Sequence, residues 1–306
     1  MDINLRQRSV IAPGRTLYAA LCFMLVICAS GLARAESLKV VATINPLHSL
    51  VSGVTDGIAG GPRSPYLLVR GNADPHAFSL RPSDARALAS AKVVFWIGPG
   101  LEQFLERPLA SLAKRARVVA LADAPKLKLI RVAGTYDPHI WLDPGNAAIM
   151  VRAIVAALSK ADPSNAGQYR ANGDRLRKRL ARLDAEIDRT VQPIRSAPFA
   201  VLHNAYRYFA QRYRLNQVVS ATVGSGSRPG ARRLIQVRKR LRETGARCIF
   251  REPETTLDLA RTIAQGSNAR IAVLDPLGAD IKPGPDAYFA VMRRIARDFR
   301  SCLSRP

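Results

Sequence analysis

Three of the four histidines in this chain follow apolar runs that are typical of β-strands. His203 ends the run FAVLH, His76 comes shortly after YLLV, and His139 comes shortly after LKLIRV. Asp275 ends a further run, RIAVLD. Ligands of parallel α/β sheets bind beyond the carboxyl ends of the strands, so we expect these four side chains to converge. Three imidazoles and one carboxylate form a tetrahedral, nitrogen-rich site that suits Zn²⁺.

The prediction depends on all three histidines following predicted strands, because a single loop histidine is more often a hydrogen-bonded polar residue than a ligand. His48, the fourth histidine, follows Pro46 at the start of an expected helix. We interpret it as a structural or solvent-facing residue. The second ring nitrogen of a ligand histidine usually donates to a carboxylate or a carbonyl, and near His139 the candidates are Asp137, Asp143 and the nearby backbone.

The elements that must position these residues form two sets of alternating strands and helices. The first half predicts strands at 37–44, 66–69, 92–98 and 117–122, with helices between them. The second half predicts strands at 199–203, 217–221, 247–250 and 270–275, separated by helices near 204–212, 231–243, 255–266 and 286–300. Alternation of this kind predicts parallel sheets covered by helices.

Residues 163–192 separate the two halves with a long, charged, glycine-poor helical pattern. This segment predicts a rigid strut instead of a flexible linker. The predicted fold class is therefore α/β, with two lobes, each a roughly four-stranded parallel sheet with flanking helices, joined by one long rigid helix. The predicted divisions are a signal peptide at 1–35, an N-terminal lobe at 36–162, the connecting helix at 163–192 and a C-terminal lobe at 193–306.

The N-terminus has the pattern of a secretory signal peptide. Three arginines precede the apolar run LYAALCFMLVICASGLA, which ends in a small-x-small site that predicts cleavage after Ala35. The alternative is an uncleaved membrane anchor, but the apolar core is short for a span. Lipidation at Cys28 is disfavoured because Ile27 precedes it. We therefore expect export to the periplasm.

Removal of the signal would take Cys22 and Cys28 with it and leave only Cys248 and Cys302. An even pair in an oxidising compartment predicts one disulfide, which would tie the C-terminal tail to a strand. The alternative is two free, buried thiols.

The formal charge of +24 invites an interpretation as a protein that binds nucleic acid or anionic membranes. After loss of 1–35 the chain still carries about +21. However, the basic residues are scattered, and the densest run, RLRKRLARLDAEIDR, alternates with leucines and acids at helical spacing. A solvated helix face is the commoner explanation, so we expect no nucleic-acid partner.

The sequence resembles the zinc-specific cluster A-I solute-binding proteins of ABC importers over essentially the whole mature chain. The resemblance rests on the segments DPHAFSLRPSD, HIWLDP, LHNAYRYF, REPE and LDPLG. It implies two α/β lobes joined by one long helix with the metal between them, and capture of periplasmic Zn²⁺ for a membrane permease. Zinc is then the transported ligand of a protein that we expect to be a monomer and not an enzyme.

The resemblance places the three histidine ligands of the family on His76, His139 and His203. It places the carboxylate on Asp275, where water takes its place in some zinc members. Manganese members usually carry a glutamate at the position of His203, which favours zinc here. Family members with a C-terminal disulfide place its cysteines where Cys248 and Cys302 stand. Many zinc members also insert a histidine-rich loop before HIWL, and this chain has no histidine there.

Three other functions remain open at the level of sequence. A zinc hydrolase or hydratase would use the same three histidines with water, and Glu252 or Glu254 as the base. A basic exported protein acting on anionic surfaces would use the arginine-rich helices. A protein of the same fold that binds Mn²⁺ or Fe²⁺ is disfavoured by a nitrogen-rich site.

Overall fold

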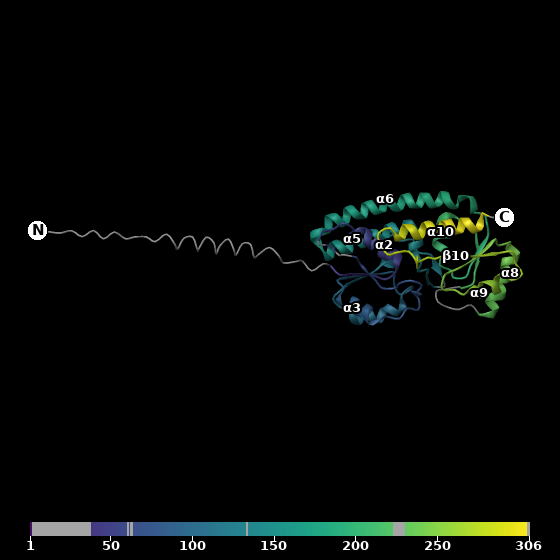
Figure 1. The fold of residues 1–306 in the computed structure, drawn as a ribbon, viewed down its shortest axis with the longest axis horizontal. Coiled ribbons are helices and arrows are strands. Elements are labelled where there is room, and N and C mark those ends of the chain that lie inside the picture. Colours follow the sequence, from purple (N-terminus) through teal and green to yellow (C-terminus); the bar gives the residue numbers. More distant parts are fainter. Residues whose placement is uncertain (2–37, 60, 62–63, 133, 223–229, 305–306) are drawn as a thin grey trace. The chain divides into compact units, whose positions relative to one another are not determined.

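The computed structural model describes Met1 and residues 38–59, 61, 64–132, 134–222 and 230–304 (Figure 1). Apart from Met1, the predicted signal peptide, with Cys22 and Cys28, lies outside the described residues. Every element below lies within the unit Ser37–Pro306. Within the described part, no helix is both long enough and apolar enough to cross a bilayer.

The first lobe is built on a four-stranded parallel sheet with the strand order β2-β1-β3-β4. Its strands are β1 (Val40–Ala42), β2 (Tyr66–Leu67), β3 (Val93–Trp96) and β4 (Arg117–Ala120). Its helices are α2 (Asn45–Thr55), α3 (Pro82–Ser90), α4 (Glu106–Leu112) and α5 (Pro144–Ala161), with the 3₁₀ turns η2 (Gln103–Leu105) and η3 (Leu121–Asp123). Strands β1 and β3 are completely buried and consist of β-branched and aromatic residues with one alanine, which suits a parallel sheet covered on both faces.

The second lobe repeats this architecture with the strand order β10-β9-β7-β8. Its strands are β7 (Phe199–Val201), β8 (Gln217–Ser220), β9 (Cys248–Arg251) and β10 (Arg270–Val273). Its helices are α7 (Arg207–Tyr213), α8 (Ala231–Thr244), α9 (Leu257–Ala264) and α10 (Ala287–Leu303). The predicted fold class of two four-stranded parallel sheets with flanking helices is confirmed.

A small antiparallel hairpin, which the sequence pattern did not predict, precedes His139. Strands β5 (Arg131–Val132) and β6 (Thr135–Tyr136) are joined by a turn in which Gly134 has a φ of +84°. Only glycine adopts this backbone region without strain. Strands of two residues are too short to produce an alternating hydrophobic pattern. They are recognised as strands only through the hydrogen bonds between β5 and β6.

The long connecting helix is present as α6 (Ala166–Val191), preceded by the 3₁₀ turn η5 (Pro163–Asn165) and followed by η6 (Gln192–Ile194). It runs beside α10 and packs closely on α5 (Figure 1). At Gly173 a Cβ atom would lie 2.5 Å from Cγ2 of Val155, so the glycine permits this close approach. The leucines of the arginine-rich run face the core while its charges lie outside, which agrees with a solvated helix face.

The predicted division of the chain into lobes at 36–162 and 193–306, with the connecting helix at 163–192, stays a prediction.

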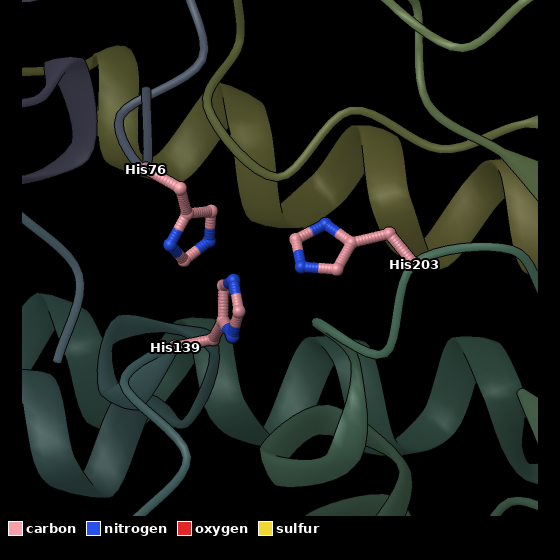
Figure 2. A group of neighbouring side chains, drawn as sticks. All are labelled: His76, His139 and His203. Atoms are coloured by element: carbon pink, nitrogen blue, oxygen red, sulfur yellow. The ribbon is translucent and has the colours of Figure 1, made fainter. Parts of the chain in front are cut away.

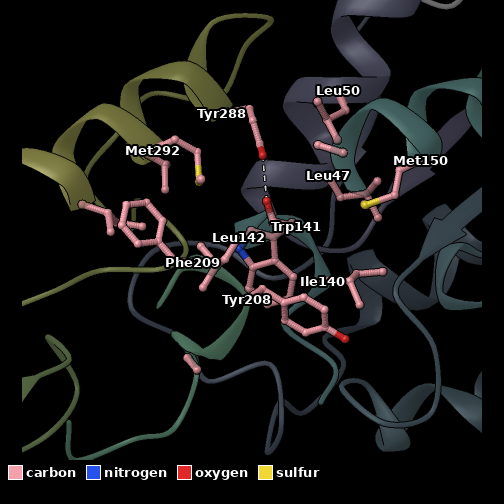
Figure 3. Close-up of a cluster of buried hydrophobic side chains, with 14 of the residues drawn as sticks. Leu47, Leu50, Ile140, Trp141, Leu142, Met150, Tyr208, Phe209, Tyr288 and Met292 are labelled. Atoms are coloured by element: carbon pink, nitrogen blue, oxygen red, sulfur yellow. Dashed lines mark hydrogen bonds between the residues drawn. The ribbon is translucent and has the colours of Figure 1, made fainter. Parts of the chain in front are cut away.

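One continuous hydrophobic core extends beneath both lobes. Figure 3 shows its centre, where the 3₁₀ turn η4 (Ile140–Leu142) packs among α2 and α5 of the first lobe and α7 and α10 of the second. Trp141 is fully buried there, and its Nε1 donates to the carbonyl of Pro276 at 2.9 Å. The hydroxyl of Tyr288 donates to the carbonyl of Trp141 at 2.7 Å. The segment that follows His139 is therefore fixed by packing from both lobes.

The predicted disulfide between Cys248 and Cys302 is present. It joins β9 to the last turn of α10 and closes a sequence separation of 54 residues. A loop of this length corresponds to about 4 kcal/mol in the chain-entropy model of disulfide stabilisation.

We expect reduction of this disulfide to lower the free energy of unfolding by about 2–4 kcal/mol, because the reduced unfolded chain gains conformational entropy. Urea unfolding of the mature protein with and without a reductant measures the difference. The double variant Cys248→Ala/Cys302→Ala is the matched control, since its urea midpoint should not respond to the reductant. Two reactive thiols in the oxidised, denatured protein would contradict the pairing.

Candidate metal centre

Three histidines from separate parts of the chain converge on one point (Figure 2). His76 lies on the loop between β2 and α3, His139 lies between β6 and η4, and His203 follows β7. The candidate ligand atoms of the three imidazoles lie within 4.8 Å of one another. The centroid of the His139 ring is 5.4 Å from that of His76 and 4.9 Å from that of His203. The structure thus brings together three of the four predicted ligands.

The ring of His139 is held by Asp137. Nδ1 of His139 donates to Oδ1 of Asp137 at 2.8 Å, and the backbone N–H of His139 donates to the same oxygen at 3.0 Å. Asp137 is itself positioned, because the hydroxyl of Tyr208 donates to its carbonyl at 2.8 Å. Of the two carboxylates that the sequence offered, Asp137 is therefore the partner of His139. Asp143 instead caps α5, where its Oδ1 accepts from the N–H of Gly145 at 2.7 Å.

The ring of His203 is held in the same way by a carboxylate that is distant in sequence. Nδ1 of His203 donates to Oε2 of Glu252 at 2.7 Å. Glu252 is 3% exposed, and its second oxygen accepts from the hydroxyl of Tyr206 at 3.3 Å. Sequence reasoning considered Glu252 only as a catalytic base. The partnership depends on the neighbouring register of β7 and β9, to which no local sequence signal points.

Two imidazole nitrogens at the centre of the cluster are buried without a partner. Nε2 of His76 and Nε2 of His203 make no hydrogen bond to any described residue. An unpaired buried nitrogen costs about 1–3 kcal/mol, so such atoms call for a function. His203, whose Nδ1 donates to a carboxylate and whose Nε2 is unpaired, has the arrangement of a metal ligand. The residues present therefore fit a divalent ion that prefers nitrogen donors.

The surroundings of His76 and His203 favour the neutral form of these two imidazoles. Burial, followed by the neighbouring imidazoles of His139 and His203, lowers the pKa of His76 to about 2. Burial also lowers the pKa of His203, against the opposing effect of Glu254, Asp74 and Asp137. A metal ion needs the unprotonated nitrogen, so this environment removes the competing proton at neutral pH.

The structure does not place Asp275 in the histidine cluster. Its Oδ1 accepts from the N–H groups of Leu277 and Gly278 at 2.9 and 2.8 Å, and its Oδ2 accepts from the N–H of Ala279 at 2.7 Å. The carboxylate thus caps the turn after β10, in which Gly278 has a φ of +67°. Its assignment as the fourth ligand stays a prediction.

His48 lies outside the cluster and is buried, not solvent-facing. Its Nε2 lies 3.0 Å from the carbonyl of Pro65, and its Nδ1 lies 3.4 Å from the hydroxyl of Ser52. This agrees with a structural role and excludes the solvent-facing alternative.

The fold and the cluster together define a class of protein. Two α/β lobes joined by one long helix, with three imidazoles converging from both lobes, are the architecture of a metal-binding solute-binding protein. Residues 40–302 match the family model described as "Zinc-uptake complex component A periplasmic", ZnuA. The chain belongs to this ZnuA family.

Individual relatives agree with this placement. The high-affinity zinc uptake system protein ZnuA of Brucella suis is 35% identical, over 95% of this chain and 98% of that protein. The protein of the same name from Yersinia pestis is 31% identical, over 87% of this chain and 92% of that protein. Among solved structures, a zinc-bound ZnuA with residues 138–173 deleted has a TM-score of 0.77 at 27% identity and covers 89% of this chain and all of that one.

We expect Asp137→Asn to weaken zinc binding by about tenfold to a hundredfold. The neutral amide of Asn accepts the Nδ1–H of His139 more weakly than the charged carboxylate of Asp137 does. Asp143→Asn is the matched control: it makes the same chemical change six residues along the chain, at a helix cap. Its zinc affinity should stay within about twofold of wild type. Competition against a chelating dye measures both, and equal losses in the two variants would contradict the assignment.

We also expect the metal-free protein to lose stability as the pH falls below about 6.5. The buried imidazoles stay neutral in the folded state, whereas in the unfolded chain they bind protons near their usual pKa of about 6.5. The unfolded state then holds more protons, and the free energy of unfolding falls by up to about 1.4 kcal/mol per pH unit for each such histidine.

Thermal unfolding of metal-free protein between pH 7.5 and 5.5 measures this effect. His76→Gln should show a shallower slope than wild type, because it removes one of the contributing groups. A slope that is the same in both proteins would mean that His76 titrates normally in the folded state.

Proposed function

We propose that this protein captures Zn²⁺ with high affinity in the periplasm and delivers it to the permease of an ABC importer. The observation that carries the proposal is the pair of buried, unpartnered Nε2 atoms on His76 and His203, in a cluster where carboxylates orient the rings of His139 and His203. The family and the names of the relatives, high-affinity zinc uptake system proteins, support the same function.

We assign the zinc ligands to His76, His139 and His203, with Asp275 or water in the fourth position. A tetrahedral shell of three imidazoles and one oxygen is common for zinc. Asp275 reaches the ion only if it gives up part of its bonding to three backbone N–H groups, so water is the stronger candidate in the arrangement described. A nitrogen-rich set disfavours Mn²⁺ and Fe²⁺, which take oxygen donors more readily than zinc does.

Transport, and not catalysis, is the use that fits the surroundings of the cluster. A zinc hydrolase needs a carboxylate free to take a proton from the metal-bound water. Glu252 is instead committed to orienting His203 and also accepts from Tyr206. Burial, followed by the neighbouring Glu252, raises the pKa of Glu254 to about 8, so at neutral pH this carboxyl is largely protonated and a poor proton acceptor. The segment 1–35 supports export, and the family description supports the periplasm as the destination. We propose that the protein acts as a monomer.

The test is zinc titration of the mature protein and of single variants. We expect one zinc per chain. Replacing His76, His139 or His203 by Ala should weaken binding at least about tenfold, because water replaces a stronger nitrogen donor. Asp275→Ala should cost less than any of the three, and His48→Ala should leave the affinity within error.

Thermal unfolding of each metal-free variant is the control, since Asp275→Ala and His48→Ala both remove hydrogen bonds that stabilise the fold. Two tightly bound zinc ions per chain would refute the single site. A loss in His48→Ala equal to that in His139→Ala would show that the ligands are assigned wrongly.

A further inference from the structure

The C-terminal lobe contains a second concave feature, which we call the arginine groove. It lies between α7, β8 and α8 and has a volume of about 930 Å³. Four arginines line it, and among its described lining residues none is acidic. These arginines are Arg207, Arg214, Arg233 and Arg240. Five side-chain amides also line the groove, so its surface is rich in hydrogen-bond donors.

Among the described residues, two of the four groove arginines have an acidic neighbour within 4 Å: Arg207 lies near Asp137 and Arg240 lies near Glu243. Arg240 approaches Glu243 at 3.8 Å, an exposed ion pair of a kind that contributes little energy. Arg233 is held rigidly, because its Nη2 donates to the carbonyl of Ser220 at 2.6 Å and its Nε donates to that of Ala221 at 3.3 Å. A guanidinium held in this way has lost much of its conformational entropy before a ligand arrives.

The groove also adjoins the metal centre. Asn204, which follows the ligand candidate His203, lines it and accepts from the side chain of Gln217 at 2.9 Å. Arg207 lines the groove and lies 3.9 Å from Oδ2 of Asp137, the residue that holds His139. One arginine thus faces both the groove and a carboxylate that orients a ligand.

We propose that the arginine groove binds an acidic polypeptide segment of the membrane partner that receives the zinc. The inference rests on the proposed function and adds the chemistry of the docking surface. Guanidinium groups pair with carboxylates in a bidentate manner, and side-chain amides suit a peptide backbone. A protein with a net charge of about +21 after removal of 1–35 is also drawn to an acidic partner over a longer range.

Other anionic partners fit the groove less well. Single-stranded nucleic acids stack their bases on aromatic side chains, and no described lining residue is aromatic. The surface of a bilayer contacts convex or flat basic faces, whereas these arginines line a concavity. Strand β8 is the outer strand of its sheet in the described part of the chain, so an extended segment can run along it.

The acidic segment should bind the zinc-loaded protein more tightly than the metal-free protein. Zinc adds two positive charges to neutral imidazoles next to Arg207, and a nearby anion then gains Coulomb energy. At low salt we expect a difference of about twofold or more. By reciprocity, the acidic segment must raise the affinity for zinc by the same factor.

A labelled octaglutamate peptide is the probe, and fluorescence anisotropy on mature, zinc-loaded protein at low salt is the measurement. We expect Arg214→Gln/Arg240→Gln to weaken peptide binding by about fivefold or more, since two charged contacts are lost. The matched control is Arg182→Gln/Arg189→Gln, which removes the same charge from exposed positions on α6, away from α8 in Figure 1. It should change binding by less than about twofold.

Equal losses in the two double variants would overturn the inference, because general charge would then explain binding. Stronger binding of tripolyphosphate, or of vesicles that contain an anionic phospholipid, than of octaglutamate would also overturn it. Peptide binding that is equal or tighter in the metal-free protein would refute the coupling to zinc. Zinc titration of the same samples tests the proposed function separately, since groove variants that bind zinc normally but lose the peptide concern docking alone.

Discussion

The structure depends most on the burial of neutral imidazoles around a common centre. A buried nitrogen without a hydrogen-bond partner costs free energy, and two such atoms, on His76 and His203, face the same point. The surroundings nevertheless fix two of the three rings independently of any ion. Asp137 and Glu252 hold Nδ1 of His139 and His203, and both carboxylates are buried. The site is thus formed in advance, and an ion that enters it gains binding energy without ordering the ligands.

Packing at the centre of the molecule stabilises this preorganised arrangement. The residues immediately after His139 form a buried turn that contacts helices of both lobes, and Trp141 donates to the carbonyl of Pro276 across the lobes. The same contact fixes the turn that begins at Asp275, whose carboxylate accepts three backbone N–H groups. One interlobe contact therefore positions both a ligand candidate of the first lobe and the carboxylate turn of the second. Movement of the lobes would change both together.

The arginines of the chain lie in two different surroundings, the solvent-exposed face of α6 and the arginine groove. Along α6 the arginines occupy the solvent face of a helix whose leucines are buried, and several pair with acids, such as Arg177 with Asp174. Such pairs contribute little stability and mainly keep the helix soluble. Between α7 and α8, four arginines instead line a concave surface without acidic residues among its described lining: Arg207, Arg214, Arg233 and Arg240. The scattered charge in the sequence therefore separates into two environments only when the chain is folded.

The sequence by itself determined the fold class and the histidine cluster, since both arise from local patterns. Strands and helices alternate with recognisable hydrophobic periods, and polar residues at the carboxyl ends of parallel strands meet at one edge of the sheet. The tertiary structure alone decided which groups complete the site. Glu252 reaches His203 because β7 and β9 are neighbours in register, and Asp275 turns to its own backbone because the tight loop after β10 supplies three N–H donors. These choices depend on distances between segments far apart in the chain, which no local pattern encodes.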